Sequence, residues 1–91
     1  MSIDVCIQIG NSDNKLLQDE WSNYCKMVLY LSECYGTVHF SGGSAIDAPW
    51  QNYCVCLYTE EPLLLKGEIE HCRKIFRQDS VAWLQGHVEF V

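Results

Sequence analysis

The apolar residues of this chain follow two different spacings in turn, and that alternation restricts the possible folds more than any single motif. From residue 3 to residue 9, every second side chain is apolar, which is typical of a strand buried on one face. From residue 16 to residue 35, apolar side chains recur every three or four positions. That spacing predicts an amphipathic helix of about five turns, which Gly36 ends.

The rest of the chain repeats the same two spacings. Alternation predicts strands at residues 37–41 and 53–59, joined by a long connection that begins with two glycines. Val38 and Phe40 are expected to share one face of the first of these strands, opposite His39. Pro62 follows two acidic residues and predicts the start of a second helix, which runs to about residue 76. A last strand is expected from residue 81.

The order strand, helix, strand, strand, helix, strand predicts an α+β fold of the ferredoxin-like βαββαβ type. Right-handed crossovers give such a chain a four-stranded antiparallel sheet with both helices on one face. The 91 residues are enough for one hydrophobic core, so we expect a single domain, 1–91.

The charge of the chain restricts its partners. Twelve acidic residues against six basic ones give a net charge of −6. Like charges repel, so direct binding to nucleic acid or to an anionic membrane is disfavoured, and a basic protein partner is favoured. The N-terminus has no basic region and carries Asp4 inside its apolar run, which is unlike a signal peptide, and we interpret the six cysteines as reduced thiols. These features predict a cytoplasmic protein.

In the expected topology, three polar segments lie at one end of the sheet: residues 11–15, 42–52 and 77–80. We call this the three-loop end. One interpretation is a binding edge, because binding residues concentrate on loops held by a rigid scaffold. The alternative is that these residues form only turns and helix caps, with Trp50 folded onto the core. The candidate binding residues are Asn11, Ser12, Asp13, Lys15, Trp50, Gln51, Asn52, Arg77, Gln78 and Asp79.

A second candidate surface is the sheet face without helices. Cys6, Cys54, Cys56 and Tyr58 are expected there, and a weakly polar face of this kind favours a homodimer or a protein partner. His39 would lie on the same face, which makes a metal site an alternative. Residues two apart on a strand place their side chains roughly 6.6 Å apart, which is far for two ligands of one ion. We therefore predict no metal site and no cofactor.

Catalytic signals are weak. The run His39-Phe40-Ser41 resembles half of the paired His-x-Ser/Thr signature of 2H phosphoesterases, but the chain has no second copy. Nucleophile elbows and phosphate-binding loops are also missing from the sequence. Binding is therefore the favoured class of function. A small-molecule or nucleotide module at the three-loop end and a minor hydrolase that uses His39 are the alternatives.

The three polar segments also carry a resemblance. Residues 10–16, 48–52 and 77–83 read GNSDNKL, APWQN and RQDSVAW. These strings resemble a group of small proteins from phages and bacteria, over nearly the whole chain. Small acidic phage proteins often inhibit host defence, anti-CRISPR proteins among them. The resemblance implies an inhibitor that acts in the host cytoplasm, and it implies no enzymatic activity.

Overall fold

The computed structural model describes residues 2–45, 48 and 50–91, so part of the connection between the middle strands lies outside the described residues. Seven elements follow one another along the chain. They are β1 (Ile3–Gly10), a short 3-10 turn (Ser12–Asn14), α1 (Gln18–Tyr35), β2 (Gly36–Gly43), β3 (Asn52–Thr59), α2 (Pro62–Ile75) and β4 (Ala82–Gly86).

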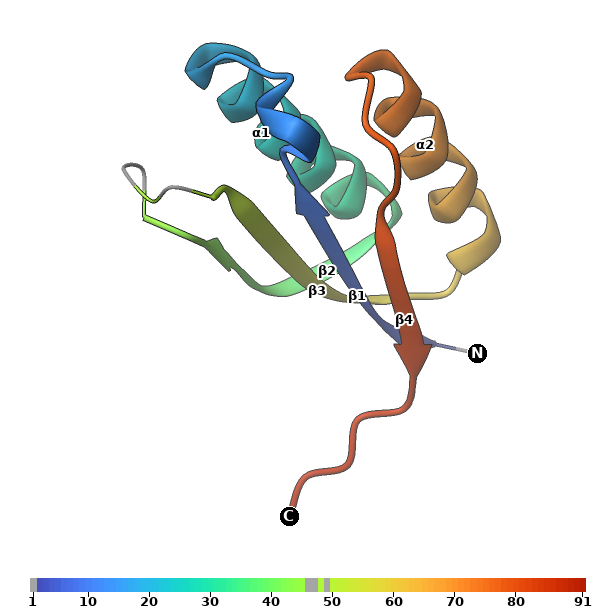
Figure 1. Ribbon diagram of the computed structural model, residues 1–91. Coiled ribbons are helices and arrows are strands. Elements are labelled where there is room, and N and C mark those ends of the chain that lie inside the picture. Colours follow the sequence, from blue (N-terminus) through green and yellow to red (C-terminus); the bar gives the residue numbers. More distant parts are fainter. Residues whose placement is uncertain (1, 46–47, 49) are drawn as a thin grey trace.

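The strands form one antiparallel sheet in the order β2-β3-β1-β4, and both helices lie on the same face of it (Figure 1). The predicted α+β architecture is confirmed. β1 and β3 are the central strands and pair over their full length, from Ile3 opposite Thr59 to Gly10 opposite Asn52. The last strand ends at Gly86, and residues 87–91 form no strand.

The core fills the space between the helices and the sheet. Alternate residues of the central strands point toward the helices, because the side chains of a strand alternate between its two faces. The apolar stripes of α1 and α2 meet them. The buried members are Val5, Ile7 and Ile9 of β1, Leu16 just before α1, Val55 and Leu57 of β3, Trp21, Tyr24 and Val28 of α1, and Leu65, Ile69 and Cys72 of α2.

β2 differs from the expected strand. Its register against β3 shifts between Val38 and Phe40, so His39 is the extra residue of a β-bulge. Val38 packs against the core, whereas Phe40 pairs with Cys56 and is 56% exposed. The expectation that Val38 and Phe40 share a face is therefore wrong, because the bulge reverses the alternation at this point.

No helix within the described residues is long and apolar enough to cross a membrane.

Candidate functional site

Hydrogen bonds connect the loop after β1 with Gln51, just before β3, and with Gln78, just after α2, at the end of the sheet where β1 finishes and β3 begins. The backbone N–H of Asn11 donates to the carbonyl oxygen of Gln51 at 3.3 Å. The backbone N–H of Ser12 donates to Oε1 of Gln78 at 2.7 Å. The loop after β1 is thus joined to both other loops. Asn11, Ser12, Gln51 and Gln78 thus come together as the topology predicts, and the role of the candidate residues in binding stays a prediction.

The side chain of Asn11 holds two of these segments. Its Nδ2 donates to the carbonyl oxygen of Leu16 at 2.9 Å and to Oε1 of Gln51 at 2.6 Å, while its Oδ1 accepts from the N–H of Leu16 at 2.9 Å. Leu16 is buried in the core, so these bonds fix the loop to the core. Gln51 in turn donates to Oε1 of Gln18, at the start of α1, at 2.8 Å. Asn11 and Gln51 therefore position the loops.

Gln78 has the same positioning role at the third segment. Its side chain is buried, accepts from the N–H of Ser12 and donates from Nε2 to the carbonyl oxygen of Phe76 at 2.9 Å. Its own carbonyl oxygen accepts from Nη1 of Arg73 at 2.8 Å. The buried side-chain amide of Gln78 therefore has a partner for its oxygen and for its nitrogen. Its removal would leave the N–H of Ser12 and the carbonyl oxygen of Phe76 without these bonds.

The two cations among the candidate binding residues, Lys15 and Arg77, are paired with acids. Lys15 Nζ lies 2.9 Å from Oδ1 of Asp79, and Arg77 Nη2 lies 3.0 Å from Oε2 of Glu20. Lys15 also donates to the carbonyl oxygen of Arg77 at 3.3 Å. A nucleotide site would need both cations turned toward a ligand beside Trp50. Because each is occupied by a carboxylate, no specific observation favours the nucleotide module.

Non-glycine residues with a left-handed backbone conformation also lie at this end. Asp13 and Asn14 each have a φ of 53°, which short polar side chains tolerate, and Arg77 has a φ of 57°. Arg77 directly follows Phe76, the C-cap residue of α2, at the position where glycine is usual. The N–H of Gln78 donates to the carbonyl oxygen of Arg73 at 3.0 Å, as in a Schellman motif. Such strain persists where the surrounding structure enforces it.

A polar hollow of about 550 Å³ opens between the three loops and the adjoining strands. Each loop region contributes to its lining, through Ser12, Asn52 and Ser80, and β1 contributes Gln8. Within the described residues, these four side chains make no hydrogen bond from their own polar atoms, in contrast to Asn11, Gln51 and Gln78. The groups available to a ligand are therefore largely different from the groups that hold the loops.

Trp50 lies in the connection that leads into β3. Its side chain is 65% exposed. The alternative in which Trp50 folds onto the core as a lid is therefore wrong. A large exposed indole is a feature of binding surfaces, since tryptophan is enriched at interface hot spots. Asp13 is exposed and Asp79 is exposed beside Lys15.

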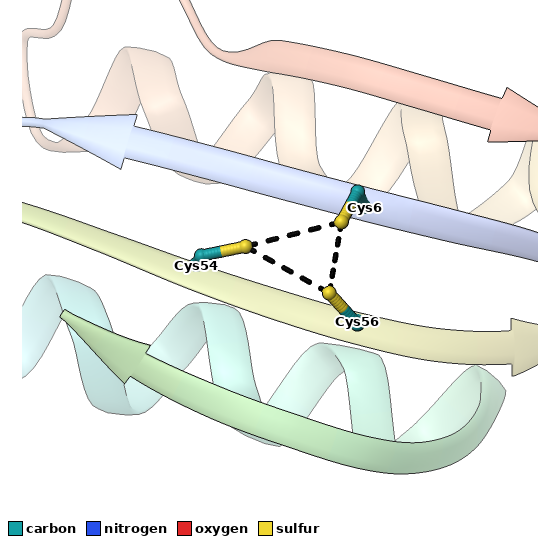
Figure 2. Close-up of side chains that lie close together, drawn as sticks. All are labelled: Cys6, Cys54 and Cys56. Carbon is teal, nitrogen blue, oxygen red and sulfur yellow. Dashed lines mark hydrogen bonds between the residues drawn. The ribbon is translucent and has the colours of Figure 1, made fainter.

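The second candidate surface is the sheet face without helices, where three thiols converge (Figure 2). The sulfur of Cys6 on β1 lies 2.8 Å from that of Cys56 and 3.9 Å from that of Cys54, both on β3, and the last two sulfurs are 3.8 Å apart. The argument from strand spacing against a common ligand is therefore wrong, because the side chains lean together. Tyr58 shares this face and is half-exposed. Self-association through the face stays a prediction.

Two thiols of this cluster, Cys54 and Cys56, are hard to ionise. Burial, followed by the neighbouring Cys6 thiol, raises the pKa of Cys56 to about 12, and burial raises the pKa of Cys54 as well. A catalytic cysteine needs a lowered pKa, so these groups do not resemble an activated nucleophile. His39 Nε2 lies 3.9 Å from Oδ1 of Asp4, and His39 is half-exposed at the bulge. No observation favours a hydrolase that uses His39.

The arguments for function rest on this geometry, because neither the protein-family comparison nor the search of curated proteins gives a match to this chain.

Proposed function

We propose that this protein is a small binding protein that engages a basic partner protein through its three-loop end. One observation carries the proposal. The three loops are tied to one another by side-chain hydrogen bonds, while the side chains of Gln8, Ser12, Asn52 and Ser80 leave their polar groups unpaired within the described residues around one hollow.

A surface held in this way suits recognition. Binding costs conformational freedom, and a surface that is rigid before the partner arrives loses less of it. Asn11, Gln51 and Gln78 supply that rigidity, since their amides connect the loops to the core and to each other. The exposed indole of Trp50 would supply the apolar contact area, and the polar groups that line the hollow would fix orientation.

The charge distribution supports a basic partner. Three of the six cations, Lys15, Lys74 and Arg77, are neutralised by carboxylates at 2.9 to 3.3 Å. The acids outnumber the bases by six, so the surface carries an excess of negative charge. A complementary positive surface would be steered toward it and would be favoured over an acidic one.

The finer assignments belong to the same proposal. The strand order β2-β3-β1-β4, with a helix after β1 and another after β3, supports a fold of the ferredoxin-like type. The resemblance of the three loop segments to phage proteins supports an inhibitor of host defence, of the anti-CRISPR kind, as the biological form of this binding role.

Site-specific photo-cross-linking tests the proposal even though the partner is unidentified. Trp50 is replaced with benzoylphenylalanine, and the matched control carries the same group at Leu63, an exposed residue in the first turn of α2. Both proteins are expressed in cells of the organism that carries the gene. We expect one basic polypeptide to be captured from position 50, with excess unlabelled wild-type protein suppressing the capture.

Three results would contradict the proposal. The same polypeptide could be captured equally from position 63, which would indicate contact without a defined surface. The captured species could be acidic, or it could be nucleic acid, and either outcome would contradict the charge argument.

A further inference from the structure

We propose that Cys6, Cys54 and Cys56 form a binding site for a single Zn²⁺ ion, held by three thiolates on the helix-free face of the sheet. This inference goes beyond partner binding, because none of the three thiols lines the hollow of the three-loop end. It rests on the convergence of three sulfur atoms from two neighbouring strands (Figure 2).

The pairing of β1 with β3 places the thiols together. Cys6 and Cys56 are directly opposite one another, and Cys54 is the diagonal neighbour of Cys6 on the same face. Opposite side chains on an antiparallel pair have Cβ atoms only about 4.5–5.5 Å apart, and diagonal neighbours are still within reach. All three sulfurs lie within 4.8 Å of one another. The site is therefore built into the most extensively paired part of the sheet.

The separations of the sulfurs suit a tetrahedral ion. With Zn–S bonds of about 2.3 Å, the sulfurs of a tetrahedral site lie roughly 3.8 Å apart. Cys54 lies 3.8 Å from Cys56 and 3.9 Å from Cys6. The Cys6–Cys56 separation of 2.8 Å must open by roughly 1 Å to reach the same value. Rotation about the Cα–Cβ bond of either side chain provides that change without moving the sheet.

Apolar side chains border the thiol pair. Phe40, Cys56, Cys6 and Leu84 lie in one row across the four strands, so an apolar side chain flanks each end of the pair. Zinc takes cysteine as a thiolate, so binding of Zn²⁺ would release the thiol protons to solvent.

The fourth coordination position is open toward a hollow. A cavity of about 320 Å³ is lined by Cys6 and Cys56 together with His39, Asp4 and His87. Zinc sites that are not purely structural keep one position for water or another ligand, and this hollow provides the room for it. Soft thiolates select zinc or copper(I) over the hard ions Mg²⁺ and Ca²⁺, so the ligand set itself excludes the latter.

Metal titration of the reduced protein tests the site. The apoprotein is kept in a phosphine reductant without oxygen and titrated with Co²⁺ as an optical probe, then with Zn²⁺. We expect one equivalent of Co²⁺ to give the visible bands of tetrahedral coordination and a thiolate charge-transfer band, and Zn²⁺ to abolish both. Zn²⁺ affinity should fall as the pH is lowered, because protons compete for the thiolates.

Four single variants locate the site. Cys6→Ser, Cys54→Ser and Cys56→Ser should each weaken Zn²⁺ binding at least tenfold. The matched control is Cys34→Ser, which removes an exposed thiol of α1 and should leave the affinity unchanged. Zn²⁺ should also raise the unfolding temperature of the wild type and of the control, and not that of the cluster variants. Circular dichroism identifies any variant that fails to fold, and the remaining cluster variants then carry the test.

Several outcomes would overturn the proposal. Octahedral cobalt bands, retention of full affinity by the folded cluster variants, or an equal loss in Cys34→Ser would do so. Binding of copper(I) with no binding of Zn²⁺ would also contradict it. The same holds if Cys6 and Cys56 oxidise to a disulfide in the presence of saturating Zn²⁺, because a bound ion should protect both thiols. None of these results would bear on Trp50 or on partner capture at the three-loop end.

Discussion

Tyr24 shows at the scale of one residue how packing can override polarity. Its ring is fully buried, stacks on Phe76 at a centroid distance of 4.8 Å and meets the edge of Trp21 at 6.1 Å. Its hydroxyl has no hydrogen-bond partner in the described part of the chain. Burial raises the pKa of this hydroxyl above its ordinary value, so it stays neutral. Burial of the ring stabilises the fold, whereas burial of the hydroxyl without a partner lowers the free energy of unfolding.

Tyr24→Phe should therefore raise the free energy of unfolding or leave it unchanged. An unsatisfied buried hydroxyl costs about 1–3 kcal/mol, and phenylalanine keeps the ring. The matched control is Thr59→Val, since the buried Thr59 hydroxyl donates to the carbonyl oxygen of Tyr35 at 2.7 Å and accepts from the N–H of Glu61 at 2.9 Å. That variant should be destabilised. Urea denaturation measures both, and a clear loss of stability in Tyr24→Phe would indicate a partner for its hydroxyl.

At the scale of elements, Gly43 and Gly67 differ in the space that the fold leaves for a side chain. Gly43 ends β2, and a Cβ at this position would overlap the carbonyl oxygen of Asn52 on β3. Gly67 lies within α2, where a Cβ would meet no atom within 4 Å. The first glycine is required by the close approach of two strands, and the second only lowers the stability of a helix.

Gly43→Ala should therefore lower the free energy of unfolding by about 1–3 kcal/mol, as overpacking does. Gly67→Ala should raise it by about 1 kcal/mol, because alanine favours the helical backbone. Thermal or urea unfolding of the pair checks both signs in one experiment. Equal effects at the two positions would show that β2 does not approach β3 as closely as described.

The elements that the sequence predicts well are those with a complete local pattern. β1 and β3 each present an unbroken apolar face to the helices, so alternation alone defines them. β2 has only Val38 against the core, and its bulge at His39 depends on the register with β3, which no local pattern contains. The end of α2 is equally hard to predict from the sequence, because Arg77 occupies the position at which glycine usually marks the end of a helix.

The candidate site is predictable in outline and not in detail. Topology alone brings the three loops to one end. The hydrogen bonds that hold them join residues 40 and 66 positions apart, such as Asn11 with Gln51 and Ser12 with Gln78, and pairing at that range is not visible in a sequence. Gln8 and Ser80 are missing from the candidate residues, although Ser80 lies within the predicted segment 77–80. Alternation places Gln8 on the outward face of β1, and this is the one signal that could have indicated it.

At the scale of the whole molecule, the two candidate surfaces adjoin without sharing a residue, since Gln8, which lines the hollow, is directly opposite Cys54 on β3. The three-loop end lies where β1 finishes and β3 begins, and the thiol cluster lies on the open face of the sheet. Because they share no residue, loss of zinc binding should leave the partner surface intact, and the reverse should hold as well. The central claim is that the three-loop end, with Trp50 as its exposed anchor, is the surface that binds the partner.

The measurement that tests this claim most directly is the affinity of Trp50→Ala for the cross-linked partner, with urea denaturation of the same variant beside it. Truncating an interface tryptophan commonly costs about 2 kcal/mol or more, so we expect affinity to fall about thirtyfold. Stability should fall by less than about 1 kcal/mol because the side chain is exposed, whereas Trp21→Ala in the core should lose about 3–5 kcal/mol. Wild-type affinity in Trp50→Ala, or a loss of stability as large as that of Trp21→Ala, would contradict the account.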